Sequence, residues 1–264
     1  MSHKVSAVIP TYNRRGPAAA AIASALRQTQ PLHELIVIDD GSTDGTWDDL
    51  QSLASGAGGP AIVARRQHNA GPSAARNAVV ALATGDFIAF LDSDDTWHEN
   101  KTARQLAVFD AHPELALVGC ASNDIAVFDG QGLVPIDVDR LLFRNYFQTP
   151  GVMLRREVLA AAGGFAADMR RCEDYDLWLR IAAGHPCALL NEVLMHCGGG
   201  KRSFGESGLS ASLWTMQAAE LDVYRRWRAR GGPAPKYLYA LLVCWLRFAR
   251  RAAIAAADRL LTRR

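Results

Sequence analysis

The chain has 264 residues, of which 49% are hydrophobic and 21% are charged, and its formal net charge is +2. These values are ordinary for a soluble globular protein, and the length suits one large α/β domain with a small appendage. No stretch approaches the length of a membrane span, and we expect no signal peptide because the apolar run Val5–Ile9 is too short.

The cysteines and the charges indicate a compartment and a division of the chain. The five cysteines are scattered and lack any C-x-x-C spacing. This pattern disfavours a zinc site and favours reduced thiols, so we expect a cytoplasmic protein. Residues 201–264 hold 13 Lys/Arg and 4 Asp/Glu, whereas residues 1–200 hold 16 and 23. An acidic body with a basic tail suggests a metal-dependent site in the first part and an anionic partner for the second.

Strand and helix patterns alternate four times in the first part of the chain, with short turns between them. The predicted strands are Lys4–Pro10, Glu34–Asp39, Ala61–Arg65 and Phe87–Leu91. The predicted helices are Pro17–Gln28, a helix from Asp44 or Thr46 to about Ser55, and Pro72–Ala83. Such alternation is the signature of a doubly wound, mostly parallel sheet with right-handed crossovers.

The pattern becomes less regular after Trp97. The predicted elements there are a helix at Lys101–Ala111, a strand at Leu115–Cys120, a hairpin of Ile125–Phe128 with Leu133–Ile136, a strand at Gly151–Arg155, and helices at Arg156–Ala162, Asp174–Ala183, Ser210–Arg230 and Lys236–Thr262. We therefore expect a main α/β domain over residues 1–208, divided near residue 98, and a helical extension over residues 209–264.

The segment Lys236–Arg264 is amphipathic. The basic residues Lys236, Arg247, Arg250 and Arg251 share one helical stripe, and Leu238, Leu241, Leu242, Trp245, Phe248 and Ala252 face the other way. One interpretation is a helix packed on the domain, or on a second copy of the chain, with a solvated basic face. The other is an interfacial helix on an anionic inner leaflet. The sequence supports both equally.

An acidic cluster follows the predicted strand Phe87–Leu91. Asp92, Ser93, Asp94 and Asp95 lie at its carboxyl end, where open α/β sheets form their ligand crevice. Crowded carboxylates repel one another unless a cation compensates them, so the cluster predicts a divalent-metal site beside a ligand. The alternative is a solvated acidic turn. A calcium-binding EF-hand loop fits worse, because its sixth position would be Trp97 and its twelfth Ala103.

Three further places carry candidate site residues. Asp39 and Asp40 end the second predicted strand, where a carboxylate can accept hydrogen bonds from a base or a ribose, although an Asx-turn is the simpler explanation. Arg76 lies one turn inside a helix and could hold a diphosphate or brace the acidic cluster. Glu173 and Asp174 begin a helix, where the helix dipole alone favours acidic residues but where a general base could also lie.

Five motifs in order resemble those of the family 2 inverting glycosyltransferases of the GT-A fold. They are VSAVIPTYNR, IDDGSTDGT, NAGPSAARN, GDFIAFLDSDD and CEDYDLWLR, and they span about residues 5–196. The resemblance implies a single doubly wound (Rossmann-like) sheet flanked by helices. It also implies a nucleotide-sugar half over about residues 1–98 and an acceptor half over about residues 99–208.

The resemblance assigns roles to the candidate residues. The implied nucleotide-sugar site consists of Pro10, Tyr12, Asp39, Asp40, Arg76, Asp92 and Ser93. Within it Asp40 would contact the base and Asp92 the ribose, while Asp94, together with Asp92, would bind Mg²⁺ or Mn²⁺. Asp174 would be the general base, with Glu173 as its alternative. For His196 a structural role is at least as well supported as a metal-binding one.

The implied function is inverting transfer of a sugar from a nucleotide-diphosphate-sugar to a hydroxyl of a glycan or polyprenyl-linked acceptor. We expect this in bacterial-type cell-surface polysaccharide synthesis, in the cytoplasm or on the inner face of the cell membrane, with no nucleic-acid partner. An alternative from another class is a catalytically inactive sugar-nucleotide-binding or scaffold protein. A nucleotidyltransferase is disfavoured because the turn after the first strand is Thr11-Tyr12-Asn13 rather than a glycine-rich loop, and no G-x-G-x-x-G supports a dehydrogenase.

Overall fold

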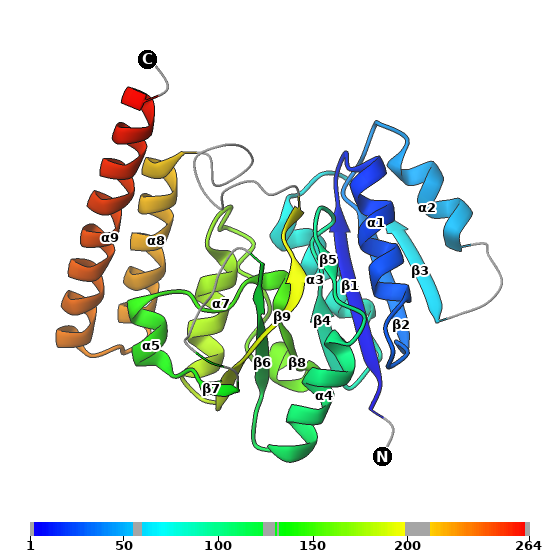
Figure 1. Ribbon diagram of the computed structural model, residues 1–264, viewed down its shortest axis with the longest axis horizontal. Helices are drawn as coiled ribbons and strands as arrows, with labels where there is room; N and C mark the ends of the chain where they lie inside the picture. Colours follow the sequence, from blue (N-terminus) through cyan, green and yellow to red (C-terminus); the bar gives the residue numbers. More distant parts are fainter. Residues whose placement is uncertain (1–2, 55–59, 124–129, 131, 199–211, 262–264) are drawn as a thin grey trace.

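The computed structural model describes residues 3–54, 60–123, 130, 132–198 and 212–261, and it contains one mixed sheet with helices on both faces (Figure 1). The strands are β1 (Val5–Thr11), β2 (Glu34–Asp39), β3 (Ala61–Arg66), β4 (Phe87–Phe90), β5 (Thr96–Trp97), β6 (Leu117–Ser122), β7 (Leu133–Pro135), β8 (Met153–Arg155) and β9 (Cys187–His196). The helices are α1 (Arg15–Leu26), α2 (Thr46–Ala54), α3 (Pro72–Leu82), α4 (Lys101–Ala111), α5 (Val138–Phe143), the 3₁₀ turn η1 (Thr149–Gly151), α6 (Arg156–Ala161), α7 (Glu173–Ala182), α8 (Leu213–Ala229) and α9 (Ala234–Leu261).

The first half of the sheet is parallel, in the order β3-β2-β1-β4. Strands β1, β2 and β4 are buried, which explains their unbroken apolar runs, whereas β3 at the edge of the sheet is partly exposed and ends in two arginines. In β1, Val8 packs in one core cluster with Ala75 and Val79 of α3, whereas Ile9 packs in the other with Ile22 of α1. The predicted GT-A-type arrangement of a sheet flanked by helices is confirmed.

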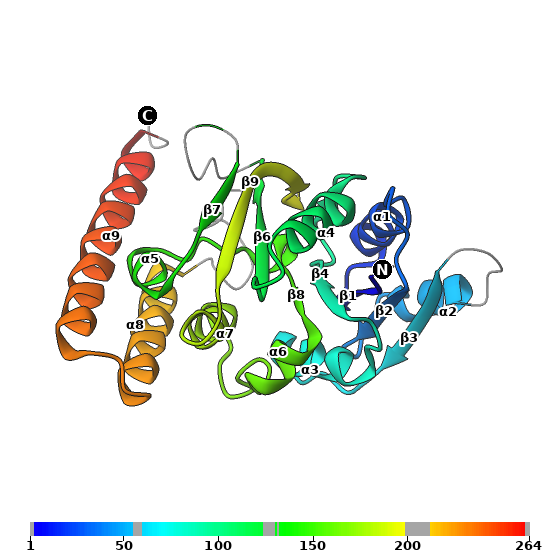
Figure 2. The ribbon, with the colours of Figure 1, turned by 90° about the horizontal axis from the view of Figure 1, so that it is seen from below.

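Figure 2 shows the two helical layers from below. Helices α1 and α4 cover one face of the sheet, and α3, α6 and α7 cover the other. Strand β1 was predicted to stop at Pro10 but continues to Thr11. Its last register pair with β4 is Val8↔Phe90, so from Ile9 onward it pairs with β2 alone. A proline is tolerated there because its missing N–H would face a side of the strand that has no partner.

The second half of the sheet contains the antiparallel pairs. Strand β8 runs antiparallel to both β4 and β6, and β9 runs parallel to β6 but antiparallel to β5 and β7. Of the predicted hairpin, residues 125–128 lie outside the described residues, and Leu133–Pro135 pairs with β9. The sequence analysis missed β5, β9, α5 and η1.

Aromatic packing fixes the start of α7 beside the carboxyl end of β4. Trp178 is fully buried, with its ring 6.4 Å from Phe90, 6.4 Å from Phe147 and 6.1 Å from Phe165, measured between ring centroids. Tilted and edge-on rings at these separations attract beyond their buried area. The cluster holds Glu173 and Asp174, one turn earlier on α7, against the sheet edge where the acidic cluster lies.

Helices α8 and α9 form the edge of the molecule beyond α7, with α9 packed on α8 and α5 (Figures 1 and 2). The proposed domain boundary at residue 208 lies outside the described residues. Within the part of the chain that the structure describes, no helix has the length and hydropathy needed to cross a bilayer.

The orientation of α9 corrects the sequence-based interpretation. The predicted basic face is not solvated as a whole, because Lys236, Arg247 and Arg251 form ion pairs with Asp139 and Glu220 of the domain and of α8. Much of the predicted apolar stripe faces outward instead, and it is described below. Periodicity separates the two faces of a helix but does not say which of them finds partners in the fold.

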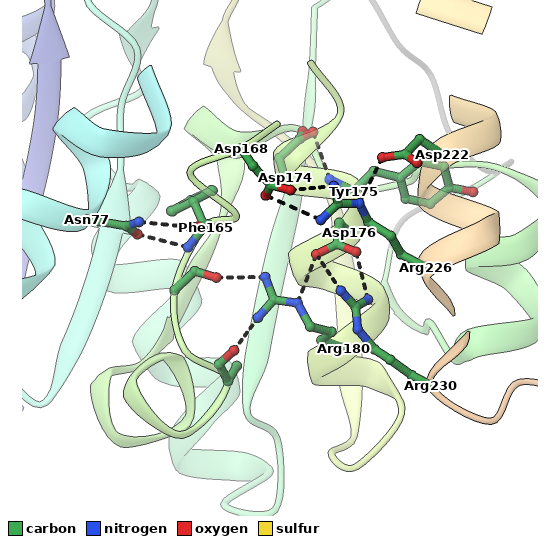
Figure 3. A network of polar contacts seen from close by, with 12 residues as sticks. Asn77, Phe165, Asp168, Asp174, Tyr175, Asp176, Arg180, Asp222, Arg226 and Arg230 are labelled. Carbon is green, nitrogen blue, oxygen red and sulfur yellow. Dashed lines mark hydrogen bonds and ion pairs between the residues drawn. The ribbon is translucent and has the colours of Figure 1, made fainter. Parts of the chain in front are cut away.

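Buried charge fastens α8 to α7. Asp176 of α7 is fully buried and accepts hydrogen bonds from Arg180 Nε (2.9 Å) and from Arg230 Nη1 (2.7 Å), which directly follows α8 (Figure 3). Nearby, Arg226 bridges Asp168 and Asp222 at a more exposed position. Asp176 therefore supports the fold.

Replacing Asp176 by alanine should destabilise the protein by about 2–3 kcal/mol, because two charge-assisted hydrogen bonds to a buried carboxylate are lost. The largely buried Arg180 would keep only its two carbonyl acceptors, Ala162 and Gly164, and the more exposed Arg230 would lose its link to α7. The matched control is Asp222→Ala, which removes a partly exposed i,i+4 partner of Arg226 and should cost less than about 1 kcal/mol. Urea denaturation of both variants measures the difference. Equal losses of stability would show that Asp176 is not a buried ion-pair centre.

Candidate active site

A cleft of about 600 Å³ opens at the carboxyl ends of β1, β2 and β4 and at the start of α3. Most of the predicted site residues meet there. The cleft is lined by Pro10, Tyr12, Asp40, Arg76, Asp92, Ser93 and Asp94 from the predicted set. Motifs separated by up to 80 positions in the chain thus meet around one space, as expected when parallel strands end at the same edge.

Two of the motif turns hold each other in place at this edge. Asn13 adopts a positive φ of 51°, its backbone N–H donates to Ser42 Oγ (2.9 Å), and its side-chain oxygen accepts from the N–H of Thr43 (2.8 Å). Asparagine tolerates this left-handed conformation better than most residues. These two hydrogen bonds fix the turn that carries Tyr12, whose side chain is 47% exposed and lines the cleft.

Asp39, the last residue of β2, and Asp40, which follows it, have different surroundings. Asp39 is fully buried, accepts from the N–H of Ser42 and pairs with Arg66 Nε at 3.1 Å, and it does not line the cleft. Asp40 lines the cleft, and its carboxylate accepts from the N–H groups of Ala70 (3.0 Å) and Gly71 (2.9 Å) and from Gln67. Asp40 therefore shapes the loop before α3.

Arg76 joins the two acidic motifs. Its Nη2 donates to Asp92 Oδ1 (2.8 Å) and its Nη1 to Glu173 Oε1 (2.7 Å), while its side chain is only 8% exposed. Burial lowers the pKa of the guanidinium, but the charges of Asp92 and Glu173 outweigh it, so the pKa is raised and the group stays charged. Its buried Nε has no partner among the described residues. Of the roles predicted for Arg76, the structure shows the bracing one.

The acidic loop between β4 and β5 is held from both sides. Asp95 accepts from the N–H of Gly198, just after β9, at 2.7 Å, and a side chain at position 198 would collide with the backbone of Asp94. Asp94 itself is 53% exposed, with Arg14 Nη2 3.8 Å away. No group of three or more candidate ligands from His, Cys, Asp and Glu occurs in the described residues. Two carboxylates that line a cleft nevertheless fit Mg²⁺ or Mn²⁺, which commonly complete their coordination with substrate phosphates and water.

Asp174 lies beside the Arg76–Glu173 pair and is half-buried, outside the set of residues that line the cleft. It accepts from the hydroxyl of Thr149 (3.2 Å) and from the N–H of Tyr175 (2.7 Å). Burial, and next the charge of Glu173, raise the pKa of Asp174 to about 6, although Arg76 opposes the change. A carboxylate with such a pKa can take up a proton near neutral pH.

The turn η1, which carries Thr149, is held in place by side chains of β5 and α4. Trp97 Nε1 donates to the carbonyl of Pro150 (2.7 Å), and Gln105 Nε2 donates to the carbonyl of Gly151 (2.9 Å). Sequence reasoning missed Thr149 because this contact joins residues 25 positions apart. It also passed over the cleft residues Arg14, Met169 and Arg170, although Arg14 lies in the first motif and Arg170 shortly precedes Glu173.

The side chain of His196 is exposed at the end of β9, where its backbone is in register with Thr96 of β5. This position puts it on the strand pair that follows the acidic loop. Among the described residues His196 lies in no cluster of three or more candidate metal ligands, and its two predicted roles stay predictions.

Comparisons with known proteins agree with this geometry. The sequence model of the family described as Glycosyl transferase family 2 matches residues 6–170. The chain is 29% identical over 226 residues to UDP-Glc:alpha-D-GlcNAc-diphosphoundecaprenol beta-1,3-glucosyltransferase WfgD of Escherichia coli, covering 83% of this chain and 84% of that one. It is 40% identical over 102 residues to the putative teichuronic acid biosynthesis glycosyltransferase TuaG of Bacillus subtilis, where the match covers 39% of this chain and 40% of that one.

Among solved structures, the mannosyltransferase PcManGT from Pyrobaculum calidifontis in complex with GDP-Man and Mn²⁺ superposes with a TM-score of 0.71. That match covers 99% of this chain and 79% of the other at 20% sequence identity, so it is a likeness of fold.

The raised pKa of Asp174 predicts a gain in stability when its charge is removed. Because the pKa rises from 3.8 to about 6 on folding, the stability contributed by the protonated form is complete below pH 4 and lost as the pH rises through 6. Asp174→Asn should therefore raise the free energy of unfolding at pH 8 by up to about 3 kcal/mol and change it little at pH 4. Each kcal/mol corresponds to about 2–4 °C in Tm, measured by calorimetry.

The control is Asp168→Asn, because a hydrogen bond from Arg226 lowers the pKa of the Asp168 carboxyl. That variant should gain no stability at pH 8. An equal gain for Asp174→Asn at both pH values would mean that its pKa is not raised.

Proposed function

This chain belongs to glycosyl transferase family 2, and from that premise we propose that it is a metal-dependent, inverting glycosyltransferase that uses a nucleotide-diphosphate-sugar donor. The observation that carries the proposal is the double contact of Arg76 with Asp92 and Glu173. It brings the acidic loop after β4 and the start of α7 to one place. Donor-binding and proton-accepting groups then lie within reach of one substrate.

The donor site is assigned to the cleft. Tyr12 would pack against the base. The carboxylate of Asp40 already accepts three hydrogen bonds, and its fourth acceptor position would bind an N–H of the base. Asp92, whose second oxygen is not bound to Arg76, would accept from the ribose. Asp39 would act indirectly, by fixing the turn that carries Asp40.

Asp94, with Asp92 beside it, would hold the metal ion. A bound Mg²⁺ or Mn²⁺ would neutralise the charge that develops on the diphosphate leaving group. Asp94 suits this role because it lines the cleft, is about half exposed, and lies only at the long distance of 3.8 Å from Arg14. The cation of Arg14 would in turn lie near the same phosphates.

Asp174 is the proposed general base, taking the proton from the acceptor hydroxyl that attacks the anomeric carbon. Its pKa of about 6 leaves it ionised at neutral pH yet able to accept a proton. Glu173 is the weaker candidate because its carboxylate already accepts from Arg76. That engagement also supports inversion, since a retaining double displacement needs a second free carboxylate as nucleophile.

The acceptor is proposed to be a hydroxyl of a glycan, lipid-linked as in the name of WfgD, within cell-surface polysaccharide synthesis. We propose that the reaction takes place on the cytoplasmic side, at or near the membrane. The scattered cysteines of the chain would stay reduced in that compartment. Asp92 and Asp94 line the cleft, and Arg76 links Asp92 to Glu173, the neighbour of Asp174, which favours an enzyme over a sugar-nucleotide-binding scaffold.

Asp94→Ala should abolish Mn²⁺-dependent binding of a nucleoside diphosphate, because it removes the exposed carboxylate of the pair. Isothermal titration of UDP and GDP, with and without Mn²⁺, measures this effect. Asp48→Ala, at an exposed position on α2, is the control and should bind like the parent. Unchanged Mn²⁺-dependent affinity in Asp94→Ala would refute the assignment of the metal site.

Asp174→Asn should cut sugar transfer by a factor of about 100 or more while nucleotide binding persists, the usual scale for losing a general base. In the parent, kcat/KM should rise with pH through about 6, following the pKa of Asp174. Thr149→Val should shift this rise in kcat/KM to higher pH, because the Thr149 hydroxyl stabilises the ionised carboxylate of Asp174. Thr149→Ser, which keeps a hydroxyl, should show the pH dependence of the parent. Near-parent turnover by Asp174→Asn together with an inactive Glu173→Gln would identify Glu173 as the base.

A further inference from the structure

The outward face of α9 is apolar. Leu238, Leu242 and Leu246 are 63%, 59% and 62% exposed, and Tyr239 and Trp245 are about half exposed. They recur at spacings of three and four residues, so they form one stripe along the helix. Six of the eleven large exposed hydrophobic side chains in the described residues belong to α8 and α9.

The stripe continues onto α8. Trp214 is 68% exposed, and its ring lies 4.6 Å from that of Phe248, which in turn lies 5.8 Å from Trp245. Two tryptophans therefore flank one buried ring at the junction of the two helices. We call this surface, made of Trp214, Leu238, Tyr239, Leu242, Trp245 and Leu246, the outer stripe. Contiguous exposed apolar surface of this kind marks a site of interaction.

The inward ion pairs explain why the stripe is exposed. Arg247 contacts Glu220, the hydroxyl of Tyr224 (3.1 Å) and the carbonyl of Phe143, and Arg251 donates to Glu220 Oε2 at 3.2 Å. Lys236 pairs with Asp139 at 2.5 Å. With its polar side bound to the domain in this way, α9 turns the leucines outward.

The charged residues around the outer stripe are of one sign. On α8, Arg225 and Arg228 lie 11 and 14 positions after Trp214 and so share its side of the helix, and Arg250 lies one turn after Leu246. All three are exposed. The acidic residues whose side chains are described on these helices are Glu220, which is buried, and Asp222, which is paired with Arg226.

We propose that the outer stripe docks on an anionic lipid surface, with its leucines and tryptophans at the interface and the neighbouring arginines over the lipid headgroups. Aromatic residues favour the membrane–water interface, and each nearby Arg adds attraction to anionic lipid. A second copy of the chain fits less well, because a two-fold contact through this face would bring like-charged arginines together. The proposal goes beyond sugar transfer, and its test needs no donor or acceptor.

The test is flotation of the full chain with vesicles of phosphatidylcholine alone or mixed with phosphatidylglycerol. The parent should prefer the anionic vesicles, and L242Q/L246Q should bind them about tenfold or more weakly. The matched control L53Q/L82Q changes two leucines that are each 38% exposed, on α2 and α3, and should bind like the parent. R225Q/R228Q should lose most of the preference for anionic over neutral vesicles.

Point variants are needed because deleting α9 would remove both arginine partners of the buried Glu220. An unchanged Tm for L242Q/L246Q establishes that its fold is intact. L238Q, one turn away on the same stripe, should also weaken binding to the anionic vesicles. The proposal is overturned if the parent ignores anionic vesicles or if L242Q/L246Q binds them as the parent does. A parent that sediments as a dimer, ignores vesicles and becomes monomeric in L242Q/L246Q would assign the stripe to a second copy instead.

Discussion

The geometry of the cleft depends on one buried guanidinium. Burial removes water from the guanidinium of Arg76, which costs free energy. Direct hydrogen bonds to Asp92 and Glu173 offset this desolvation cost. A lysine could not make both contacts in the same plane. The two carboxylates lie on segments that are 81 positions apart in the sequence. Their common partner therefore sets the distance between the acidic loop and α7, and with it the distance between the donor site and the proposed base.

The parallel half of the fold was predictable because its signals are local. Each of its strands is a short apolar run that ends in a turn, and helix α3 begins at Pro72, a residue suited to the first turn of a helix. The second half was harder. Strand β9 carries the run Cys187–Leu190 after a proline, which is a usable signal, but it pairs with three strands that come from distant parts of the chain. Such pairings leave no period in the sequence.

The candidate site shows the same limit at the level of single residues. The motifs brought Asp40, Asp92 and Asp94 to the correct edge of the sheet, because strand ends are visible in the sequence. The resemblance favoured Asp40 over Asp39 as the contact to the base, but the physical difference between them lies in Arg66 and in the loop before α3, which the sequence does not bring together. The contact of Thr149 with Asp174 and the inward turn of Arg247 likewise depend on partners that only the folded chain supplies.

The buried carboxylate of Asp176 has a consequence for modularity. It lies two positions after Asp174 on the same helix, and one of its two cations, Arg230, comes from the end of α8. The match to the family ends at residue 170, before α7 begins. A C-terminal pair of helices taken from a relative would therefore have to supply an arginine at the same place. Exchange of this part between homologues is constrained by one ion pair beside the proposed base, so α7, α8 and α9 should be inherited as a single block.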